Sequence, residues 1–312
     1  MTKIYPGNQW KDTQGVPIQA HGGGVLYYEG VYYWYGENKA AETTFERECI
    51  RHAVVGVSCY SSRDLLNWEN RGIVLPPVLD QHEHDLHSSK VVERPKVIYN
   101  KVTKQFVMYM HIDKEDYTYA AVGVALCDTP TGTFEYLGSY NPNNADSRDM
   151  TVFQDDDGKA YLFHSSEWNK TMYISPLTEN YLMTTGEVTK IFIDLGREAP
   201  AIFKRKGLYY IVTSGCSGWD PNEAEYATAT NILGPWKIIG NPCTGKDADK
   251  TFYAQSTFVI PVQGKEDAYI FMADQWNNQN LRISKYVWLP IEFNDENILI
   301  DWKEEWDLSI FK

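Results

Sequence analysis

The sequence predicts an all-β fold, a five-bladed β-propeller, and three observations support it. The 312 residues include 22 Tyr, 12 Phe, 10 Trp and 22 Gly, which is typical of strands joined by tight turns, and long helical runs of Ala, Leu, Glu and Lys are missing. Apolar, aromatic-rich segments alternate with turn signals along the chain. Five of these segments open with a similar small polar cluster, so the chain reads as a repeat.

The five openings have the spacing of propeller blades. They are His21-Gly22-Gly23-Gly24, Glu93-Arg94-Pro95, Arg148-Asp149-Met150, Arg197-Glu198-Ala199 and Ala254-Gln255-Ser256. The steps from His21 through Glu93, Asp149, Glu198 and Gln255 are 72, 56, 49 and 57 residues. Each unit offers strand, turn and strand, then two further strands, which is the content of a four-stranded blade.

Each unit contributes its own strand and turn signals. The first holds GGGVLYYEGVYYWYG, in which a Glu29-Gly30 turn joins two apolar runs and predicts a hairpin. The later units begin ERPKVIYNKVTKQFVMYMHI, RDMTVFQDDDGKAYLFHSS, REAPAIFKRKGLYYIVTSG and AQSTFVIPVQGKEDAYIFMAD, and each is followed by two shorter strand-like runs. We expect the segment from Asp301 to Lys312 to pack back on the propeller and close it.

A β-sandwich or jelly roll is the competing fold, because it also uses many short strands and turns. A sandwich would not explain why each unit begins in the same way. In a propeller the first strand of every blade lines the central channel, so the five openings converge near the axis. We therefore expect one propeller domain over residues 1–312, without a separate carbohydrate-binding module.

Two longer insertions, Asn38 to Arg51 and Pro76 to Val92, are expected to form loops over one face. The second contains His82, His84 and His87, which could be metal ligands or solvated side chains of a polar loop. We predict no metal site, and the five cysteines lack the CxxC spacing of a zinc site.

Charge and hydropathy exclude two classes of partner. The net charge of −13 argues against nucleic acid, whose binding needs a basic surface. No stretch approaches the roughly 18 to 20 apolar residues that span a bilayer.

The first residues also lack an apolar signal core, so we expect a secreted or periplasmic protein without its signal peptide, or a cytoplasmic one if Met1 is the native start. We expect a monomer.

Three of the openings carry a carboxylate, namely Glu93, Asp149 and Glu198. A single acid is commonly a solvated charge or the partner of a neighbouring arginine. Three acids at equivalent blade positions indicate a shared site, where crowding raises the pKa and can keep a Glu protonated near neutral pH. Glycoside hydrolysis needs such an acid, and inverting enzymes place a second group about 6.5 to 9.5 Å away to activate water.

Aromatic residues supply the flat apolar surfaces that sugar rings need. The segments predicted to reach the same face contain Trp168, Trp219, Trp276, Tyr117 and Tyr119, although each of these could instead belong to the core. Trp219 is the strongest candidate, because SGCSGWDPN reads as a loop. Ser217 in this loop and Tyr117 are included among the predicted sugar contacts.

With these residues the chain resembles glycoside hydrolase family 43, a group of five-bladed propeller enzymes that act with inversion. RDMTVFQDDDGKAYL resembles the family segment whose Asp, here Asp149, adjusts the pKa of the acid and orients the substrate. REAPAIFKRKGLYYI resembles the segment whose Glu, here Glu198, is the general acid. The resemblance covers nearly the whole chain.

The first unit departs from the pattern of that family. Most members begin it with Asp-Pro, where the Asp is the general base, whereas this chain has His21-Gly22-Gly23-Gly24. HGGGVLYYEGVYYWYGENK, ERPKVIYN, SRDMTVF and QSTFV together resemble the exo-β-1,3-galactanase branch, which releases galactose from the β-1,3-galactan backbone of arabinogalactan.

In that branch a Gln at the fifth opening, here Gln255, is implied to replace the base. An amide is a very weak base, so the implied mechanism uses its imidic-acid tautomer or a proton relay. The resemblance places Glu93 near the bound galactose as a sugar ligand or as a support for protonated Glu198. Glu37 is a sugar contact or a structural residue beside a turn glycine, and His21 is a further sugar contact.

The resemblance implies a β-1,3-galactan or galacto-oligosaccharide substrate and no required cofactor. A structural calcium ion, which occurs in relatives, is left open because no ligand set commits this chain to one. Two other functions also stay open. One is another family activity, such as α-L-arabinofuranosidase or β-xylosidase, and the other is a propeller that binds carbohydrate without catalysis.

Overall fold

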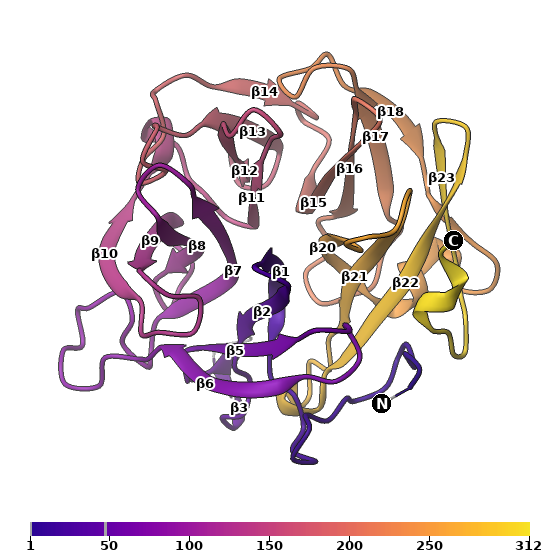
Figure 1. Cartoon of the computed structure of the whole chain (residues 1–312). Helices are drawn as coiled ribbons and strands as arrows, with labels where there is room; N and C mark the ends of the chain where they lie inside the picture. Colours follow the sequence, from indigo (N-terminus) through magenta and orange to yellow (C-terminus); the bar gives the residue numbers. More distant parts are fainter. Residues whose placement is uncertain (1, 47–48) are drawn as a thin grey trace.

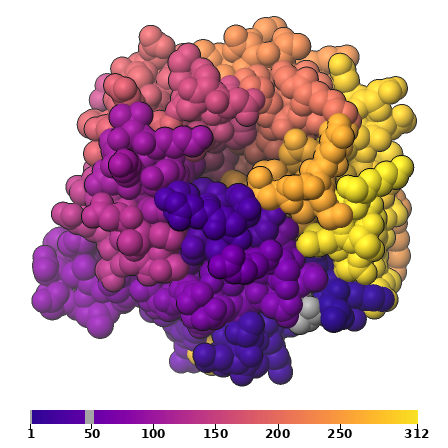
Figure 2. Space-filling model, in the orientation of Figure 1, coloured from indigo at the N-terminus to yellow at the C-terminus, as the bar shows by residue number. Residues whose placement is uncertain are grey.

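Each predicted unit folds into one antiparallel sheet, and the five sheets stand round a common axis (Figure 1). The computed structural model describes residues 2–46 and 49–312. The colours of Figure 1 follow the blades round the ring in sequence order, and Figure 2 shows the same face closing round a hollow near its centre. The prediction of a five-bladed propeller is confirmed.

The strands of the first three blades, from the axis outward, have the following bounds. The first blade contains β1 His21–Tyr28, β2 Val31–Glu37, β5 Val57–Ser62 and β6 Glu69–Leu75. The second contains β7 Val91–Asn100, β8 Gln105–Asp113, β9 Ala121–Cys127 and β10 Glu135–Tyr140. The third contains β11 Met150–Gln154, β12 Ala160–Ser166, β13 Thr171–Pro176 and β14 Thr189–Ile191.

The last two blades complete the ring. The fourth contains β15 Arg197–Arg205, β16 Leu208–Gly215, β17 Glu225–Ala229 and β18 Lys237–Gly240. The fifth contains β20 Gln255–Pro261, β21 Tyr269–Gln275, β22 Lys285–Asn294 and β23 Asn297–Asp301, with β19 Cys243–Thr244 parallel to β23. Short 3-10 helices lie at Pro142–Asn144, Ala248–Tyr253, Leu281–Ile283 and Leu308–Ile310. No helix in the described part of the chain is long and apolar enough to cross a membrane.

Four inner strands carry a register shift at their opening. The shifts fall between His21 and Gly24, Glu93 and Lys96, Glu198 and Ala201, and Ser256 and Phe258. A bulge of this kind bends the strand and re-aims its side chains. Residues inside three of the bulges have left-handed backbone, with φ of 58° at Gly22, 54° at Arg94 and 53° at Ala199. The recurrent openings in the sequence therefore correspond to a recurrent distortion of the backbone.

Polar contacts between inner strands hold neighbouring blades together at the axis. The Ser256 hydroxyl donates to the carbonyl of Ala199 at 2.6 Å, and the Thr257 hydroxyl donates to the carbonyl of Gly23 at 2.7 Å. Both hydroxyls belong to buried residues, so these bonds satisfy polar groups that water does not reach. The fifth blade is thus tied to the fourth and to the first.

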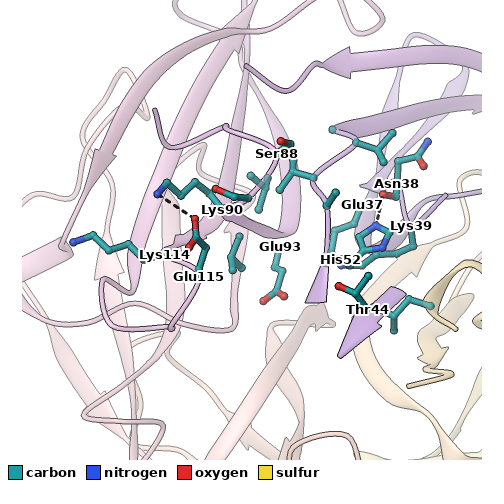
Figure 3. Close-up of a pocket in the computed structure, with 18 of the residues that line it drawn as sticks. Glu37, Asn38, Lys39, Thr44, His52, Ser88, Lys90, Glu93, Lys114 and Glu115 are labelled. Carbon is teal, nitrogen blue, oxygen red and sulfur yellow. Dashed lines mark hydrogen bonds and ion pairs between the residues drawn. The ribbon is translucent and has the colours of Figure 1, made fainter. Parts of the chain in front are cut away.

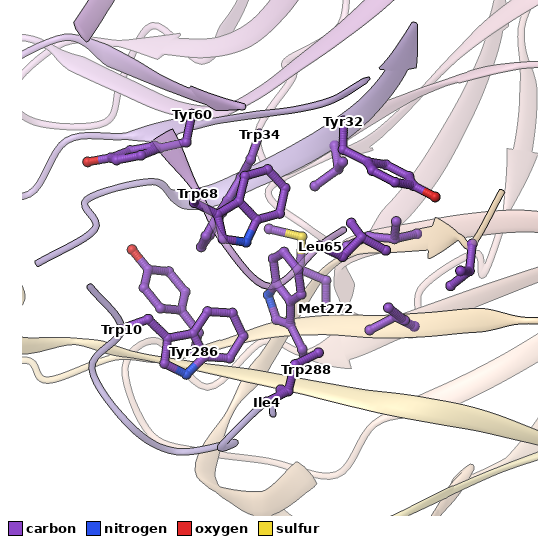
Figure 4. Close-up of a cluster of buried hydrophobic side chains, with 14 of the residues drawn as sticks. Ile4, Trp10, Tyr32, Trp34, Tyr60, Leu65, Trp68, Met272, Tyr286 and Trp288 are labelled. Carbon is purple, nitrogen blue, oxygen red and sulfur yellow. The ribbon is translucent and has the colours of Figure 1, made fainter. Parts of the chain in front are cut away.

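A cluster of buried tryptophans lies where the ring closes (Figure 4). Trp34 of β2 lies 4.8 Å from Trp288 of β22 between ring centroids, and Trp10 lies 5.0 Å from Trp288. Ile4 and Trp306 pair through two backbone hydrogen bonds of 2.7 and 3.0 Å, so both ends of the chain join this cluster. The expected packing of the last residues against the propeller is confirmed.

The two insertions differ partly from the expected loops. The first contains a short hairpin of β3 Thr43–Glu46 with β4 Cys49–His52, a pairing that its mixed sequence did not predict. The second, over residues 76–92, has turns and an isolated bridge from Val78 to His87 before β7 begins. Both insertions come together beside the axis, where they line one cavity.

Candidate active site

The polar openings meet at the side chain of Arg94, which is 5% exposed. Its guanidinium donates to both carboxylate oxygens of Asp149 at 2.9 and 2.8 Å, to Oε1 of Gln255 at 2.6 Å and to the carbonyl of Ser256 at 3.0 Å. Its backbone nitrogen donates to Oε1 of Glu37 at 2.9 Å. The planar fork of an arginine suits such a set of acceptors. One residue of β7 thereby joins the second blade to the first, third and fifth.

Glu198 is held beside this group by two amides. Its Oε1 accepts from Nε2 of Gln255 at 3.0 Å, and its Oε2 accepts from Nδ2 of Asn169 at 3.1 Å. Removal from water raises the pKa of Glu198 to about 8, and the negative charge of Asp149 adds to this rise. Glu198 is therefore protonated at neutral pH, which is the state that a general acid requires.

The orientation of the Gln255 amide is fixed by four partners. Its oxygen accepts from the Arg94 guanidinium and from the indole nitrogen of Trp276 at 3.1 Å. Its nitrogen donates to Glu198 and to the Ser214 hydroxyl at 3.1 Å. If the amide were flipped, its NH2 group would face the N–H donors of Arg94 and Trp276. The nitrogen is therefore the end that faces Glu198.

The direct contact between Gln255 and Glu198 has a mechanistic consequence. Acid and base of an inverting glycosidase lie about 6.5 to 9.5 Å apart, because the sugar and a water molecule stand between them. An amide nitrogen 3.0 Å from the carboxylate leaves no such room. The two side chains must therefore separate before Gln255 can act on the side of a sugar opposite to Glu198.

Glu93 lies in a second group of charges on β7 and β8. Its Oε1 accepts from the Tyr117 hydroxyl at 3.1 Å, and its Oε2 lies 3.3 Å from Nδ1 of His111, whose Nε2 lies 3.1 Å from Asp113. Burial pushes the pKa of Glu93 upward, but the His111 contact and the charge of Lys39 outweigh burial and lower this pKa to about 2. Glu93 is thus an ionised acceptor, suited to sugar hydroxyls.

The charge of Glu93 is balanced by its histidine partner. Burial pulls the pKa of His111 downward, but the carboxylates of Asp113 and Glu93 raise it to about 9. Asp113 is itself fixed by the backbone nitrogens of Tyr119 and Ala120, at 2.8 and 2.9 Å. The row Glu93, His111, Asp113 therefore carries a protonated imidazole between two carboxylates.

Glu37 at the end of β2 is buried and paired. Its Oε2 lies 2.5 Å from Nζ of Lys39, while its Oε1 accepts from the backbone of Arg94. A Cβ on Gly22 would lie 2.1 Å from this Oε1, and Gly22 has φ of 58°. Only glycine allows the inner strand to approach Glu37 so closely. Glu37 thus has a structural contact, and it also lines the cavity described below.

His21 is fully buried, with 0% exposure. Its Nδ1 lies 2.9 Å from Asp274, its Nε2 lies 3.3 Å from the Tyr286 hydroxyl, and its ring stacks on Tyr286 at 4.7 Å. The other oxygen of Asp274 accepts from the backbone nitrogen of Gly22 at 2.9 Å. His21 therefore supports the inner strand from within the core. The structure does not bring His21 to the cavity described below, and its expected contact with the sugar stays a prediction.

A cavity of about 750 Å³ opens beside Glu93 (Figure 3). The two insertions build much of its wall, together with residues 52–56 and 114–117, Trp219 and Leu281. Figure 3 shows Glu37 and Lys39 on one side of the cavity and Lys114 and Glu115 on the other, and Tyr117 also lines it. Cavities of this size hold small organic ligands, which includes one or a few sugar rings.

Trp219 stands between this cavity and Gln255. It lines the large cavity, and it also lines a small recess that contains Gln255 and Trp276. Trp219 is 36% exposed and packs edge-to-face on Trp276, with centroids 5.8 Å apart. The Ser217 hydroxyl donates to the carbonyl of Asp220 at 2.6 Å, so Ser217 shapes the loop that carries Trp219.

Glu198, with Asp149 and Gln255 near it at the axis and a cavity alongside, forms a site of the kind that glycosidases use. Comparison with known proteins identifies the family. Residues 20–289 match the model of glycosyl hydrolases family 43. The chain belongs to this family.

Solved structures of family 43 proteins resemble the chain over almost its whole length. A β-1,3-galactosidase of the family is 41% identical with a TM-score of 0.92, and the match covers 99% of this chain and 64% of the other. A second β-1,3-galactosidase, solved with galactodeoxynojirimycin, is 40% identical with a TM-score of 0.90 and covers 98% and 100%. An exo-β-1,3-galactanase from Phanerochaete chrysosporium, solved with β-1,3-galactotriose, is 36% identical with a TM-score of 0.89 and covers 98% and 68%.

The family 43 chain spans about two thirds of the length of the first and third of these relatives. The match with the second relative covers the whole of that chain. Two of the three relatives were solved with galactose-like ligands, galactodeoxynojirimycin and β-1,3-galactotriose.

The family 43 site also contains residues that the sequence did not single out. Arg94 was visible only as the neighbour of Glu93, and Asn169, Ser214 and His111 had no distinguishing signal. In the second insertion His82 lies 3.2 Å from Glu83 and 3.5 Å from Glu115. Within residues 2–46 and 49–312, no group of three or more His, Cys, Asp or Glu side chains could hold a metal ion.

Proposed function

We propose that the protein is an inverting exo-β-1,3-galactanase, which releases galactose from the non-reducing end of β-1,3-galactan. The observation that carries the proposal is the contact of Gln255 with Glu198 at the axis, next to a first blade that offers buried His21 instead of a carboxylate base. Sequence identity of 36% to 41% with β-1,3-galactosidases and an exo-β-1,3-galactanase supports the choice of sugar and linkage.

Glu198 is the general acid in this proposal. Its raised pKa keeps a proton available for the oxygen of the departing chain. Asp149 sustains that pKa by its charge, and the two hydrogen bonds from Arg94 keep Asp149 in place. Protonation of the glycosidic oxygen and loss of the leaving chain then build positive charge on the sugar, which nearby carboxylates stabilise.

Gln255 positions the attacking water after the sugar has separated it from Glu198. The amide oxygen accepts from Arg94 and Trp276, which is the arrangement of the ordinary amide form. In the imidic form the proton moves from nitrogen to this oxygen, so one of these two donors has to turn away as the tautomer forms. In that form the nitrogen has a lone pair and accepts a proton from water.

Glu93, Glu37 and Trp219 hold the galactose. Glu93 is ionised and lines the cavity, so it accepts hydrogen bonds from sugar hydroxyls. Trp219 offers an apolar surface between the cavity and Gln255. The substrate of the proposal is therefore β-1,3-galactan or an oligosaccharide of it.

A propeller that only binds carbohydrate is the second candidate function. The first blade favours it, because buried His21 stands at its opening and no carboxylate base is offered there. A binding protein does not, however, need a carboxyl group whose pKa is raised to about 8. The two functions differ in whether any bond is cleaved.

The test incubates the protein with β-1,3-galactobiose, an aryl α-L-arabinofuranoside and an aryl β-xyloside, and follows the released sugar by proton NMR. We expect galactose from the first substrate only, initially as the α-anomer. Glu198→Gln should lower kcat by at least about a hundredfold and keep binding, while the exposed Glu187→Gln serves as matched control. Binding of galactobiose without release of galactose would favour the second function.

Four expectations stay predictions from the sequence. They are a single catalytic domain over residues 1–312, a secreted or periplasmic location, a monomeric state and the absence of a required cofactor.

A further inference from the structure

Trp168 is an exposed indole beside the candidate acid. Its side chain is 70% exposed, although tryptophan is the largest apolar side chain and is normally well buried. The next residue, Asn169, donates its side-chain amide to Glu198 at 3.1 Å. Since consecutive α-carbons are about 3.8 Å apart, the α-carbon of Trp168 lies within roughly 11 Å of the Glu198 carboxylate.

The backbone that presents Trp168 is strained. Glu167, Trp168 and Asn169 follow one another with φ of 54°, 59° and 63°, in the left-handed region. This conformation is unfavourable for residues other than glycine, and asparagine tolerates it better than the other two. Asp146 stabilises the turn, because its carboxylate accepts from the backbone nitrogens of Glu167 at 2.7 Å and Trp168 at 3.0 Å. Strain maintained by dedicated contacts is common at functional sites.

The indole ring is also fixed in orientation. The guanidinium of Arg148 lies 4.3 Å from the ring centroid of Trp168. Arg148 is itself buried, donates to the carbonyl of Tyr117 at 3.2 Å and directly precedes Asp149 in the chain. The guanidinium occupies one face of the ring, while most of the side chain stays open to solvent. A ring that is already held in place loses little freedom when a ligand stacks on it.

From these contacts we infer that Trp168 is a stacking platform for a galactose unit of the leaving chain, one or two rings beyond the bond that is cleaved. The inference rests on the proposed function. The general acid must lie on the side of the departing oxygen, and Trp168 is linked to Glu198 through Asn169. The galactose to be released lies on the other side, near Glu93 and the cavity.

The chemistry of galactose suits such a platform. Its axial hydroxyl at C4 leaves a patch of C–H groups on the opposite ring face, and this apolar patch stacks on aromatic rings. A neutral, repeating galactan chain presents the same patch on successive units. The ligand class is therefore a β-linked galactosyl chain, held by one apolar contact rather than by charge.

The test compares Trp168→Ala, Trp168→Phe and a control, Tyr27→Ala, with the unaltered protein. Tyr27 is an exposed aromatic residue, 40% accessible, at the far end of β1 from the site. The substrates are β-1,3-galactotriose and β-galactosyl fluoride, whose leaving group contains no sugar. We expect Trp168→Ala to lower kcat/KM for galactotriose about three- to tenfold through KM. The kcat/KM of Trp168→Ala for the fluoride should equal that of the unaltered protein. The kcat/KM of Trp168→Phe for galactotriose should be intermediate, and Tyr27→Ala should change neither value.

A binding experiment separates failure of the platform from failure of the proposed function. In the Glu198→Gln background, calorimetry gives the affinity for galactotriose and for galactose, with and without Trp168→Ala. Loss of affinity for the trisaccharide alone supports the platform, even if the unaltered protein cleaves nothing. Equal losses for both sugars, or no loss for either, would overturn it, as would equal effects on galactotriose and the fluoride.

Discussion

The side-chain nitrogen of Gln255 lies 3.0 Å from a carboxylate oxygen of Glu198. Burial and the charge of Asp149 raise the pKa of Glu198 to about 8, and the hydrogen bond from Gln255 opposes this rise. A sugar that enters between the two side chains breaks the bond, so the pKa of Glu198 rises further when substrate binds. In the proposed mechanism, substrate binding thus keeps Glu198 protonated until it donates its proton to the glycosidic oxygen.

Replacement of Gln255 tests both parts of its role. We expect Gln255→Ala to lower kcat on β-1,3-galactobiose by on the order of a hundredfold or more, because water loses its positioning group. The alkaline limb of the kcat/KM profile should move to higher pH, because the hydrogen bond that lowers the pKa of Glu198 is gone. An unchanged kcat would place water activation on another residue, and Glu93, which is ionised above pH 2, is the next to test.

Gln255→Glu is the matched variant, because a carboxylate still accepts from Arg94 and Trp276. Its negative charge next to Glu198 should raise the pKa of Glu198 and move the alkaline limb upward as well. Because a carboxylate is also a true base, we expect this variant to keep more activity than Gln255→Ala. A lower activity than that of the alanine variant would contradict the assigned role.

Asp149→Asn should move the alkaline limb in the opposite direction. The charge of Asp149 disfavours ionisation of Glu198, so a neutral amide lowers the pKa of Glu198, and the unpaired charge of Arg94 lowers it again. Less of the acid is protonated at pH 7, and kcat/KM for galactobiose should decline from a lower pH than in the unaltered protein. The exposed Asp249→Asn is the control, and an unmoved alkaline limb in Asp149→Asn would rule out its part in tuning the acid.

The sequence allowed the meeting of Asp149, Glu198 and Gln255 to be predicted, because equivalent positions of a repeated blade converge on the axis. The role of Arg94 could not be predicted, since it depends on a left-handed backbone at φ of 54° and on a register shift that no residue pattern announces. The burial of His21 depends on partners more than 250 residues away in the chain. Such long-range contacts leave no local signal, which is why the burial of His21 could not be predicted from the sequence.

Arg94→Lys should reduce both activity and stability. Lysine keeps the charge but lacks the planar fork that reaches Asp149 and Gln255 together, so both lose their fixed positions. Breaking a buried charged pair costs about 3 to 5 kcal/mol when one partner is left alone, and a lysine that keeps part of the contact should cost less. We expect a lower midpoint of urea unfolding and at least a tenfold loss of kcat. Arg71→Lys, on an exposed pair with Glu69, should change stability by less than about 1 kcal/mol.

Gly22→Ala tests the close approach of the first inner strand to Glu37. Gly22 has φ of 58° and a Cβ there would lie 2.1 Å from Oε1 of Glu37, whereas Gly158 has φ of 82° and nothing within 4 Å. Gly158→Ala therefore reports backbone strain alone, about 1 to 2 kcal/mol. Gly22→Ala adds the displacement of Glu37, which breaks its bonds to Arg94 and Lys39. We expect a larger loss of unfolding free energy in urea, together with a raised KM for galactobiose that the control lacks. Equal losses of unfolding free energy in Gly22→Ala and Gly158→Ala would mean that Glu37 can move aside without cost. The close approach of Gly22 to Glu37 would then not matter for stability.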